Sequence, residues 1–329
     1  FGILTFRDYK ILMMTMQRLS VLFPNPLGCY DYLSDSPVEV GRFVVAPFGR
    51  KNMTGIVWHR SADENFPESK MKKIIGVAEN LPVFSKEKMK FIGWVAGDTL
   101  TPPGAVLKMA ICADLAKTSK KPLPFDLPQT QNIAIRFSDA QQKAVDELNE
   151  ICAEGFAVSL LDGVTGSGKT EVYFEMVARA LEKGGQVLVL LPEITLTSAW
   201  LGRFQKRFGV MPAVWHSGIT PKQRRDTWYA VVSGEARVVV GARSALFLPY
   251  RNLGLIVVDE EHDSSFKQED GVLYQARDMA VVRAKLADCS IILASATPSV
   301  ETYCNVLSGK YAHVVLPERF AGASMPDIV

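Results

Sequence analysis

The chain has 329 residues, of which 48% are hydrophobic and 22% charged, and its 37 lysines and arginines nearly balance 35 aspartates and glutamates. This composition excludes a disordered or fibrous chain, and the length predicts two domains. A net charge of +2 excludes a protein that is basic throughout, so any surface for nucleic acid must be local.

The cysteines have neither the spacing of a zinc site nor that of a disulfide framework. They are five and scattered, which is typical of reduced thiols in a cytoplasmic protein. The longest apolar runs, such as 187–191 and 255–258, have the length of strands and fall short of the roughly 18 residues of a membrane helix. We therefore expect a cytoplasmic protein with no membrane segment.

The first part of the chain, residues 17–104, is predicted to be a small β-rich domain. Residues 1–16 are interpreted as an extension, because methionines just before residue 17 offer alternative starts. Short apolar runs alternate with turns rich in proline, glycine and asparagine. The runs lie at 41–47, 55–59 and 73–77. One helix is predicted over 84–97, with Ser85 as its N-cap.

A linker is predicted over residues 105–136, where a basic run precedes three prolines. From 137 to 320 strands alternate with helices, and the strands are solid runs of valine, leucine and isoleucine. Such strands are typical of a parallel sheet buried on both faces, so the pattern predicts a doubly wound α/β lobe. Residues 321–329 are expected to begin a further connection. The expected strands are 158–161, 186–191, 213–216, 237–240, 255–258 and 290–294, and the expected helices 139–153, 169–183, 196–208, 221–233 and 276–287.

A phosphate-binding loop is predicted at 163–170, Gly-Val-Thr-Gly-Ser-Gly-Lys-Thr, which matches G-x-x-x-x-G-K-[ST] between a strand and a helix. In such a loop, backbone N–H groups and the positive end of the helix dipole face phosphate oxygens. Lys169 is expected to reach the β- and γ-phosphates and Thr170 to bind Mg²⁺. The predicted ATP-binding residues of the loop are Gly163, Thr165, Gly166, Ser167, Gly168, Lys169 and Thr170.

An acidic motif, Asp259-Glu260-Glu261-His262, follows the strand at 255–258, where ligands bind in open α/β sheets. Asp259 is the predicted Mg²⁺ ligand, through water, and Glu260 the base that deprotonates the attacking water. Acids at a helix N-terminus are the alternative interpretation. The phosphate loop in the same domain favours catalysis.

Two further sequence features are expected near this motif. Ser295-Ala-Thr297 follows the next strand and would connect Glu261 and His262 to the rest of the lobe, or would cap the next helix. Gln141, at the start of the helix before the phosphate loop, is predicted to read an adenine edge with its amide. A solvated glutamine is the alternative.

These motifs together resemble superfamily-2 helicases. The surrounding segments 192–197, 216–218, 241–247, 259–268 and 274–278 are similar to the primosomal protein N′ (PriA) family of bacterial replication-restart DNA helicases. The resemblance covers most of 137–320 and implies a RecA-like P-loop motor lobe that hydrolyses ATP with Mg²⁺. It also implies a monomer whose partners are forked or single-stranded DNA with a 3′ end, primosome proteins and single-strand binding protein.

The β-rich domain resembles the part of the same family that binds the 3′ end of a nascent strand. The resemblance implies a pocket for the terminal nucleotide, lined by Tyr30, Asp31, Tyr32, Gly49 and Lys72. An acid that accepts from a 3′-hydroxyl beside a ring that stacks on a base suits this task. The alternative is that both tyrosines belong to the core and Asp31 is merely exposed.

Single-stranded DNA is expected to cross the motor lobe as well. Hydroxyls and N–H groups near helix starts would bind phosphates, and the candidates are Thr195, Thr197, Arg243 and Ser244. For Arg243 the alternative is a surface arginine with no such role. The aromatic-rich loop, residues 263–277, follows the catalytic acids, and the resemblance implies that it links DNA occupancy to hydrolysis. Its candidate DNA contacts are Phe266, Lys267 and Tyr274, whose rings would stack on bases or, alternatively, pack onto the sheet.

Two features depart from the family. Only about thirty residues separate the two domains, too few for the winged-helix domain usual there, so we expect that domain to be lost or reduced. The second helicase lobe, with its zinc-binding insertion and arginine finger, is absent before Val329, so no zinc ligand is assigned.

The predicted function is an ATP-dependent 3′→5′ DNA helicase or translocase that recognises stalled forks and serves primosome assembly. The alternative for this chain alone is a module that binds a fork, a 3′ end and ATP without unwinding, because an arginine finger contributes roughly 10³–10⁵ in rate. A P-loop kinase is disfavoured, since Asp-Glu-Glu-His with Ser-Ala-Thr suits attack by water.

Overall fold

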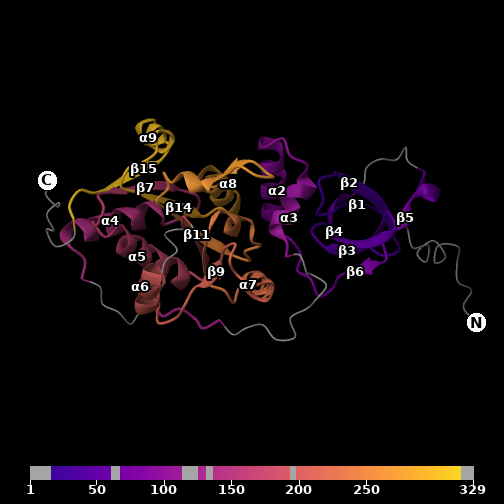
Figure 1. Ribbon diagram of the computed structural model, residues 1–329, viewed down its shortest axis with the longest axis horizontal. Helices are drawn as coiled ribbons and strands as arrows, with labels where there is room; N and C mark the ends of the chain where they lie inside the picture. The colour runs from indigo at the N-terminus through magenta and orange to yellow at the C-terminus, as the bar shows by residue number, and fades with distance from the viewer. Residues whose placement is uncertain (1–15, 61–66, 113–124, 131–135, 193–197, 320–329) are drawn as a thin grey trace, which may run out of the picture. The chain divides into compact units, whose positions relative to one another are not determined.

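The computed structural model describes residues 16–60, 67–112, 125–130, 136–192 and 198–319. The chain divides into two units, Phe1–Thr118 and Ser119–Val329, and each is described by itself (Figure 1).

The first unit is built on a six-stranded sheet with the order β5-β2-β1-β4-β3-β6. β1 pairs antiparallel with β2 and with β4, and the strands curve around a small core that contains Leu19, Val21 and Val57 (Figure 1). The strands are β1 Gln17–Leu22, β2 Cys29–Ser34, β3 Phe43–Phe48, β4 Lys51–Arg60, β5 Lys72–Lys73 and β6 Gly76–Val77. The β-rich domain that the sequence predicts is therefore confirmed.

Two helices follow these strands, α2 Lys86–Asp98 and α3 Pro103–Ala110. The predicted N-cap of α2 is confirmed, since the Ser85 side chain accepts from the N–H of Lys88 at 3.2 Å. Helix α3 starts with a proline at its first turn, where no N–H is needed, and it reaches into the segment 105–136 that the sequence predicts as a linker. The described residues between α3 and α4, 111–112, 125–130 and 136–138, contain neither helix nor strand.

The second unit has a seven-stranded sheet with the order β15-β7-β14-β11-β8-β10-β9, in which every neighbouring pair is parallel. Its strands are β7 Val158–Gly163, β8 Gln186–Leu190, β9 Ala213–Trp215, β10 Val238–Gly241, β11 Leu253–Asp259, β14 Ser290–Ser295 and β15 Ala312–Leu316. Its α-helices are α4 Asp139–Ile151, α5 Lys169–Glu182, α6 Ser198–Phe208, α7 Pro221–Ser233, α8 Ala276–Ala287 and α9 Val300–Leu307. The doubly wound α/β lobe is thus confirmed.

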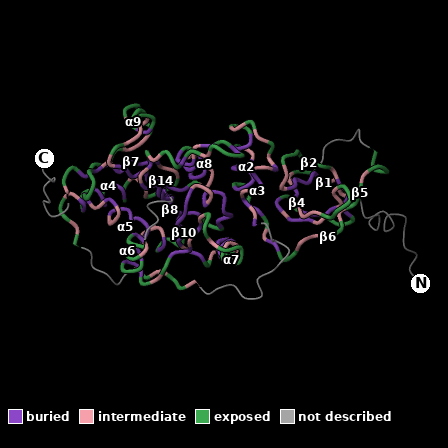
Figure 2. The backbone as a smooth tube through the Cα atoms, in the orientation of Figure 1, coloured by how far each residue is buried: buried purple, intermediate pink, exposed green. Residues whose placement is uncertain are grey.

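Helices cover both faces of this sheet. Val187 and Val189 of β8 pack into one core with α4, α5 and α6, whereas the intervening Leu188 and Leu190 are equally buried and point to the other face. Figure 1 shows α8 across the sheet from α5 and α6, and Figure 2 shows the central strands as almost entirely buried. This double cover explains why the strands are continuous apolar runs.

The last two elements, α9 and β15, were not among the expected ones. Ser299 caps α9 by accepting from the N–H of Thr302, and β15 extends the sheet beyond β7.

Among the described residues, no helix combines the length and apolar character needed to cross a membrane.

Candidate nucleotide and DNA-end sites

The phosphate loop joins the end of β7 to the start of α5. Gly166 and Gly168 have φ of +82° and +87°, a left-handed conformation that favours glycine. At Gly168 a larger residue would also clash with a neighbouring side chain, since a Cβ there would lie 2.2 Å from Nε2 of Gln141. The loop therefore needs glycine at both positions, and at Gly168 for two reasons.

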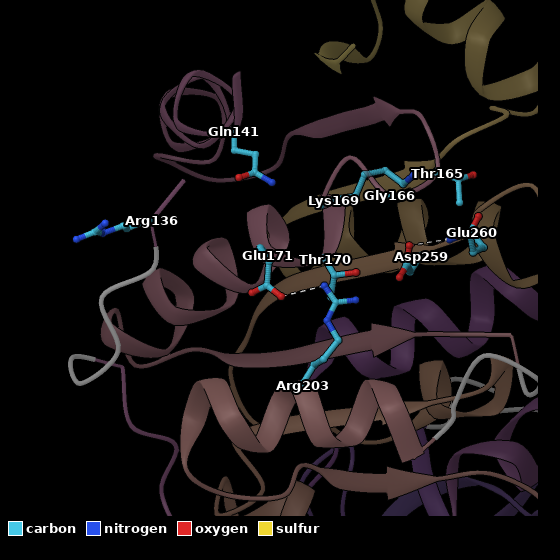
Figure 3. Close-up of a pocket in the computed structure, with 11 residues that line it drawn as sticks. Arg136, Gln141, Thr165, Gly166, Lys169, Thr170, Glu171, Arg203, Asp259 and Glu260 are labelled. Carbon is cyan, nitrogen blue, oxygen red and sulfur yellow. Dashed lines mark hydrogen bonds and ion pairs between the residues drawn. The ribbon is translucent and has the colours of Figure 1, made fainter. Parts of the chain in front are cut away.

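A pocket of about 390 Å³ opens over this loop. Its walls bring together most of the predicted nucleotide-binding residues with both catalytic acids (Figure 3). The lining residues are Arg136, Gln141, Thr165, Gly166, Gly168, Lys169, Thr170, Glu171, Arg203, Asp259 and Glu260. Gly163 and Ser167 belong to the loop but do not line the pocket. Gly163 is the last residue of β7, and Ser167 is buried.

Lys169 is buried at the bottom of the pocket, where its ammonium donates to the carbonyl of Gly163 at 2.7 Å. Burial lowers the pKa of Lys169, and the carboxylates of Glu260, Asp259 and Asp162 oppose that shift. A cation among glycine N–H groups is suited to a polyphosphate. Thr170 and Asp259 supply a hydroxyl and a carboxylate to the same pocket, the hard oxygen donors that Mg²⁺ prefers.

Asp259 sits at the end of β11 in a buried chain of hydrogen bonds. Nε1 of Trp200 donates to the Tyr173 hydroxyl, which donates to Oδ2 of Asp259, both at 2.8 Å. Burial raises the pKa of Asp259 to about 6, and the bond from Tyr173 offsets part of that rise. The sequence analysis assigned no role to Tyr173 or Trp200. Tyr173 could have been found, because it stands four residues after Lys169 on the same face of α5.

Glu260 reaches the pocket from a strained backbone position. Its φ is +50°, unusual for a residue other than glycine, and its side chain is 38% exposed (Figure 3). Strain of this kind tends to be kept where the position of a side chain matters. The placement allows its carboxylate to meet a water molecule inside the pocket.

The structure brings His262 and the Ser295–Thr297 motif together, as the sequence predicts. Nδ1 of His262 lies 2.8 Å from Oγ of Ser295, and the same Oγ accepts from the N–H of Thr297 at 3.0 Å. The motif that follows β14 is thus directly connected to the acidic motif after β11.

Glu261 points away from the pocket and is fully buried. Its carboxylate accepts from the N–H of Ser299 at 2.7 Å, from the hydroxyl of Thr302 at 2.9 Å and from Arg277 at 3.3 Å. It therefore ties the end of β11 to the starts of α8 and α9, a role that the sequence analysis expressed only as coupling.

Gln141, whose amide is expected to read adenine, makes two hydrogen bonds within the protein. Its Oε1 accepts from the N–H of Ser138 at 3.0 Å and its Nε2 donates to the carbonyl of Ser167 at 3.0 Å. The amide therefore bridges the N-cap of α4 and the phosphate loop. It is therefore not a solvated glutamine, and because the amide keeps a second N–H and lines the nucleotide pocket, its reading of adenine stays a prediction.

The first unit carries a second pocket, of about 640 Å³. It contains all five residues that the resemblance implies for the terminal nucleotide: Tyr30, Asp31, Tyr32, Gly49 and Lys72. The two tyrosines differ, however. The Tyr30 side chain is well exposed, whereas Tyr32 is buried and donates its hydroxyl to the carbonyl of Pro47 at 2.8 Å. Tyr30 is thus the ring available to a base, and Tyr32 forms the wall.

The candidate DNA-contacting residues of the helicase lobe differ in their surroundings. Thr195 and Thr197 lie outside the described residues. The guanidinium of Arg243 donates to backbone carbonyls of the aromatic-rich loop, and Ser244 is half-buried beside it. Lys267 is exposed and pairs with Glu269 at 3.1 Å.

Phe266 and Tyr274 are buried in this structure, and their stacking on bases stays a prediction. They are only 1% and 5% exposed, and the ring of Tyr274 packs against Phe247 with centroids 5.3 Å apart. In this structure the alternative that the sequence left open holds, because both rings pack inward.

Comparison with known proteins agrees with this geometry. Residues 138–306 match the DEAD/DEAH box helicase family, and residues 20–112 match the 3′DNA-binding domain (3′BD) of PriA. Replication restart protein PriA of Rickettsia conorii is 41% identical over 305 residues, which are 91% of this chain and 45% of that protein. The PriA of Haemophilus influenzae is 32% identical over 93% of this chain and 52% of its own length.

A Bacillus subtilis PriA is 43% identical over 58% of this chain. Among solved structures, RecG bound to a three-way DNA junction aligns over 60% of this chain and 25% of that chain, at 20% identity and a TM-score of 0.44. This chain spans about half the length of the curated relatives that it matches over most of its residues. The helicase match covers more than half of the chain and contains every lining residue of the nucleotide pocket except Arg136, so this chain belongs to the DEAD/DEAH box helicase family and carries a PriA-type 3′ DNA-binding domain before its helicase lobe.

Proposed function

We propose that this protein is an ATP-dependent 3′→5′ DNA helicase or translocase that recognises forked DNA by a 3′ end and serves replication restart. The observation that carries the proposal is the presence of two pockets on one chain. One is lined by Lys169, Asp259 and Glu260 around a phosphate loop, and the other is lined by Tyr30 and Asp31. The relatives named for replication restart support it over nearly all of this chain.

In the nucleotide pocket, Lys169 would exchange its bond to the Gly163 carbonyl for phosphate oxygens. Thr170 and Asp259 would hold Mg²⁺, which supplies positive charge at the β- and γ-phosphates. Tyr173 would orient the Asp259 carboxylate through the bond to Oδ2. Glu260 would hold the attacking water and accept its proton.

In the DNA-end pocket, the Tyr30 ring would stack on the terminal base. Asp31 would accept a hydrogen bond from the 3′-hydroxyl, and Lys72 would attract the adjacent phosphate. Gly49, with φ of +60°, would let the backbone come close to the nucleotide. A 3′-phosphate in place of the hydroxyl would repel the Asp31 carboxylate, so the pocket would select an unblocked end.

A second candidate is a module that binds a fork, a 3′ end and ATP without turnover. It is favoured by the arginines of the nucleotide pocket: among its described lining residues they are Arg136 and Arg203. Arg203 is paired with Glu171 at 2.9 Å, and Figure 3 shows Arg136 on the side opposite Glu260. Neither is placed as an arginine finger, whose contribution to phosphoryl transfer is roughly 10³–10⁵ in rate.

The wider setting of this function also belongs to the proposal. Primosome proteins and single-strand binding protein would be its partners, and the protein would act as a monomer. The free cysteines of the described residues agree with action in the cytoplasm. The proposal also includes the domain limits 17–104 and 137–320, with a winged helix lost or reduced between them.

The test is ATP hydrolysis by this chain, with and without single-stranded DNA, for the wild type, Lys169→Ala and Glu260→Gln. Turnover that DNA stimulates and that both substitutions abolish is the expected result. ATP binding that is lost in Lys169→Ala and kept in Glu260→Gln, with no turnover in any variant, would favour the binding module. Equal turnover in all three proteins would overturn the proposed site.

A further inference from the structure

The guanidinium of Arg243 is bound to another segment of the protein, although it is only half-buried and stays accessible from solvent. It lies at the start of η2, Arg243–Phe247, a short 3-10 helix that follows β10. Its NH1 donates to the carbonyl of Ser265 at 2.8 Å and to that of Lys267 at 2.7 Å. Both acceptors belong to the aromatic-rich loop, which begins directly after Glu260, Glu261 and His262.

The same short helix holds the far side of the loop. Phe247, at the end of η2, packs edge to face against Tyr274. Tyr274 lies on β13, Tyr274–Gln275, which pairs with β12, Lys267–Gln268. Arg243 and Phe247, at the two ends of this short helix, thus contact the two strands of one hairpin.

The packing of this hairpin leaves two buried polar groups without a hydrogen-bond partner, which costs free energy. The hydroxyl of Tyr274 and Oε1 of Gln275 are buried, and neither finds a hydrogen-bond partner in the structure. A buried polar group without a partner costs free energy comparable to a lost hydrogen bond. Opening the hairpin would return both groups to water, so the contacts that oppose opening decide the equilibrium.

A nucleic-acid phosphate competes well for such an arginine. A phosphate carries a full charge and can take two N–H groups of one guanidinium, whereas backbone carbonyls are neutral. We propose that Arg243 is a latch: it holds the aromatic-rich loop closed through the carbonyls of Ser265 and Lys267 until a DNA phosphate takes its guanidinium.

Release by DNA would free the loop and let Phe266 and Tyr274 leave their buried positions. Because the loop follows the acidic motif directly, its release would change the backbone next to His262, two residues after Glu260. This inference rests on the proposed function. It makes Arg243 a positioning residue that reports DNA occupancy to the catalytic acid, instead of a residue that only adds affinity for DNA.

Hydrogen–deuterium exchange of the peptide that covers residues 262–275 tests the latch. In the wild type without DNA we expect slow exchange, and saturating oligothymidylate should raise the rate. Arg243→Ala should exchange at least about tenfold faster without DNA, because two charge-assisted bonds are lost, and DNA should then change little. Arg251→Ala is the matched control, since Arg251 also donates to a backbone carbonyl, that of Ser233, and should leave this peptide unchanged.

Two more variants separate the parts of the latch. Arg243→Gln keeps an N–H donor but has no charge to attract a phosphate, so it should protect the loop partly and lose the response to DNA. Tyr274→Phe removes the buried hydroxyl that has no partner, so it should slow exchange in the absence of DNA.

The outcomes distinguish the latch from the proposed function. Arg243→Ala exchanging like the wild type without DNA overturns the latch. Oligothymidylate that binds without changing exchange overturns the release step. Oligothymidylate that does not bind at all overturns the proposed function, and the comparison without DNA still decides whether Arg243 holds the loop.

Discussion

Gly168 shows how one residue sets the shape of the nucleotide pocket. Its positive φ disfavours any L side chain, and a Cβ would meet an amide that Ser138 and Ser167 hold in place. Gly166 has a similar φ but open space around it. The two glycines therefore separate backbone strain from steric clash.

We expect Gly168→Ala to destabilise the helicase unit by about 2–3 kcal/mol and to weaken ATP binding at least about tenfold, since strain and clash add. Gly166→Ala should cost only about 1 kcal/mol of strain. Gly202→Ala, at an open position in helix α6, should be neutral or stabilising. Thermal unfolding and titration with a fluorescent ATP analogue measure all three. Equal effects at Gly166 and Gly168 would contradict the role assigned to Gln141.

The raised pKa of Asp259 should make the stability of the metal-free protein depend on pH. Its pKa is raised from 3.8 to about 6, so the folded carboxyl holds its proton more tightly than the unfolded one. Ionising it in the folded state therefore costs stability, and this cost grows as pH rises from about 4 to about 6.

Asp259→Asn carries no such cost. We expect its free energy of unfolding to exceed that of the wild type by up to about 3 kcal/mol above pH 6, with the difference shrinking toward zero near pH 4. Urea unfolding with a chelator, repeated from pH 4 to pH 7, measures it. A difference that does not vary with pH would show that folding does not raise the pKa of this carboxyl.

At the scale of elements, Glu261 is the joint between β11, α8 and α9. Glu261→Gln would leave the buried Arg277 without its buried partner, and breaking such a pair costs about 3 kcal/mol. Asp278→Asn is the matched control, because it removes a mostly exposed partner of the same arginine and should cost less than about 0.5 kcal/mol.

Urea unfolding of both variants measures the difference. A loss at Asp278 as large as the loss at Glu261 would mean that the buried network does not join these elements.

Some of these elements and contacts could be predicted from the sequence, and others could not. The phosphate loop, the acids after β11 and the parallel sheet follow from contiguous motifs and apolar runs, so they could be predicted. The bond of the Gln141 amide to Ser167 and the inward packing of Tyr274 could not, because each depends on a partner distant in sequence. The bond of the same amide to Ser138 belongs to a local capping box, which the Ser-x-x-Gln pattern could have predicted. Trp200 reaches Asp259 through Tyr173 only once α6 packs beside α5.

At the scale of the whole molecule, the nucleotide pocket and the DNA-end pocket belong to different units of the chain. The two binding activities should therefore separate cleanly. Lys169→Ala should abolish ATP binding and leave binding of a 3′ end intact, and Asp31→Ala should do the reverse.

If the proposed function holds, occupancy of the DNA-end pocket and turnover in the nucleotide pocket belong to one activity. The most direct measurement is the rate of ATP hydrolysis by the wild type and Asp31→Ala at a limiting concentration of forked DNA. The forks carry either a 3′-hydroxyl or a 3′-phosphate. We predict that the hydroxyl-ended fork stimulates the wild type several-fold more than the phosphate-ended fork, and that Asp31→Ala no longer distinguishes them. Equal stimulation of the wild type by both forks would contradict the account.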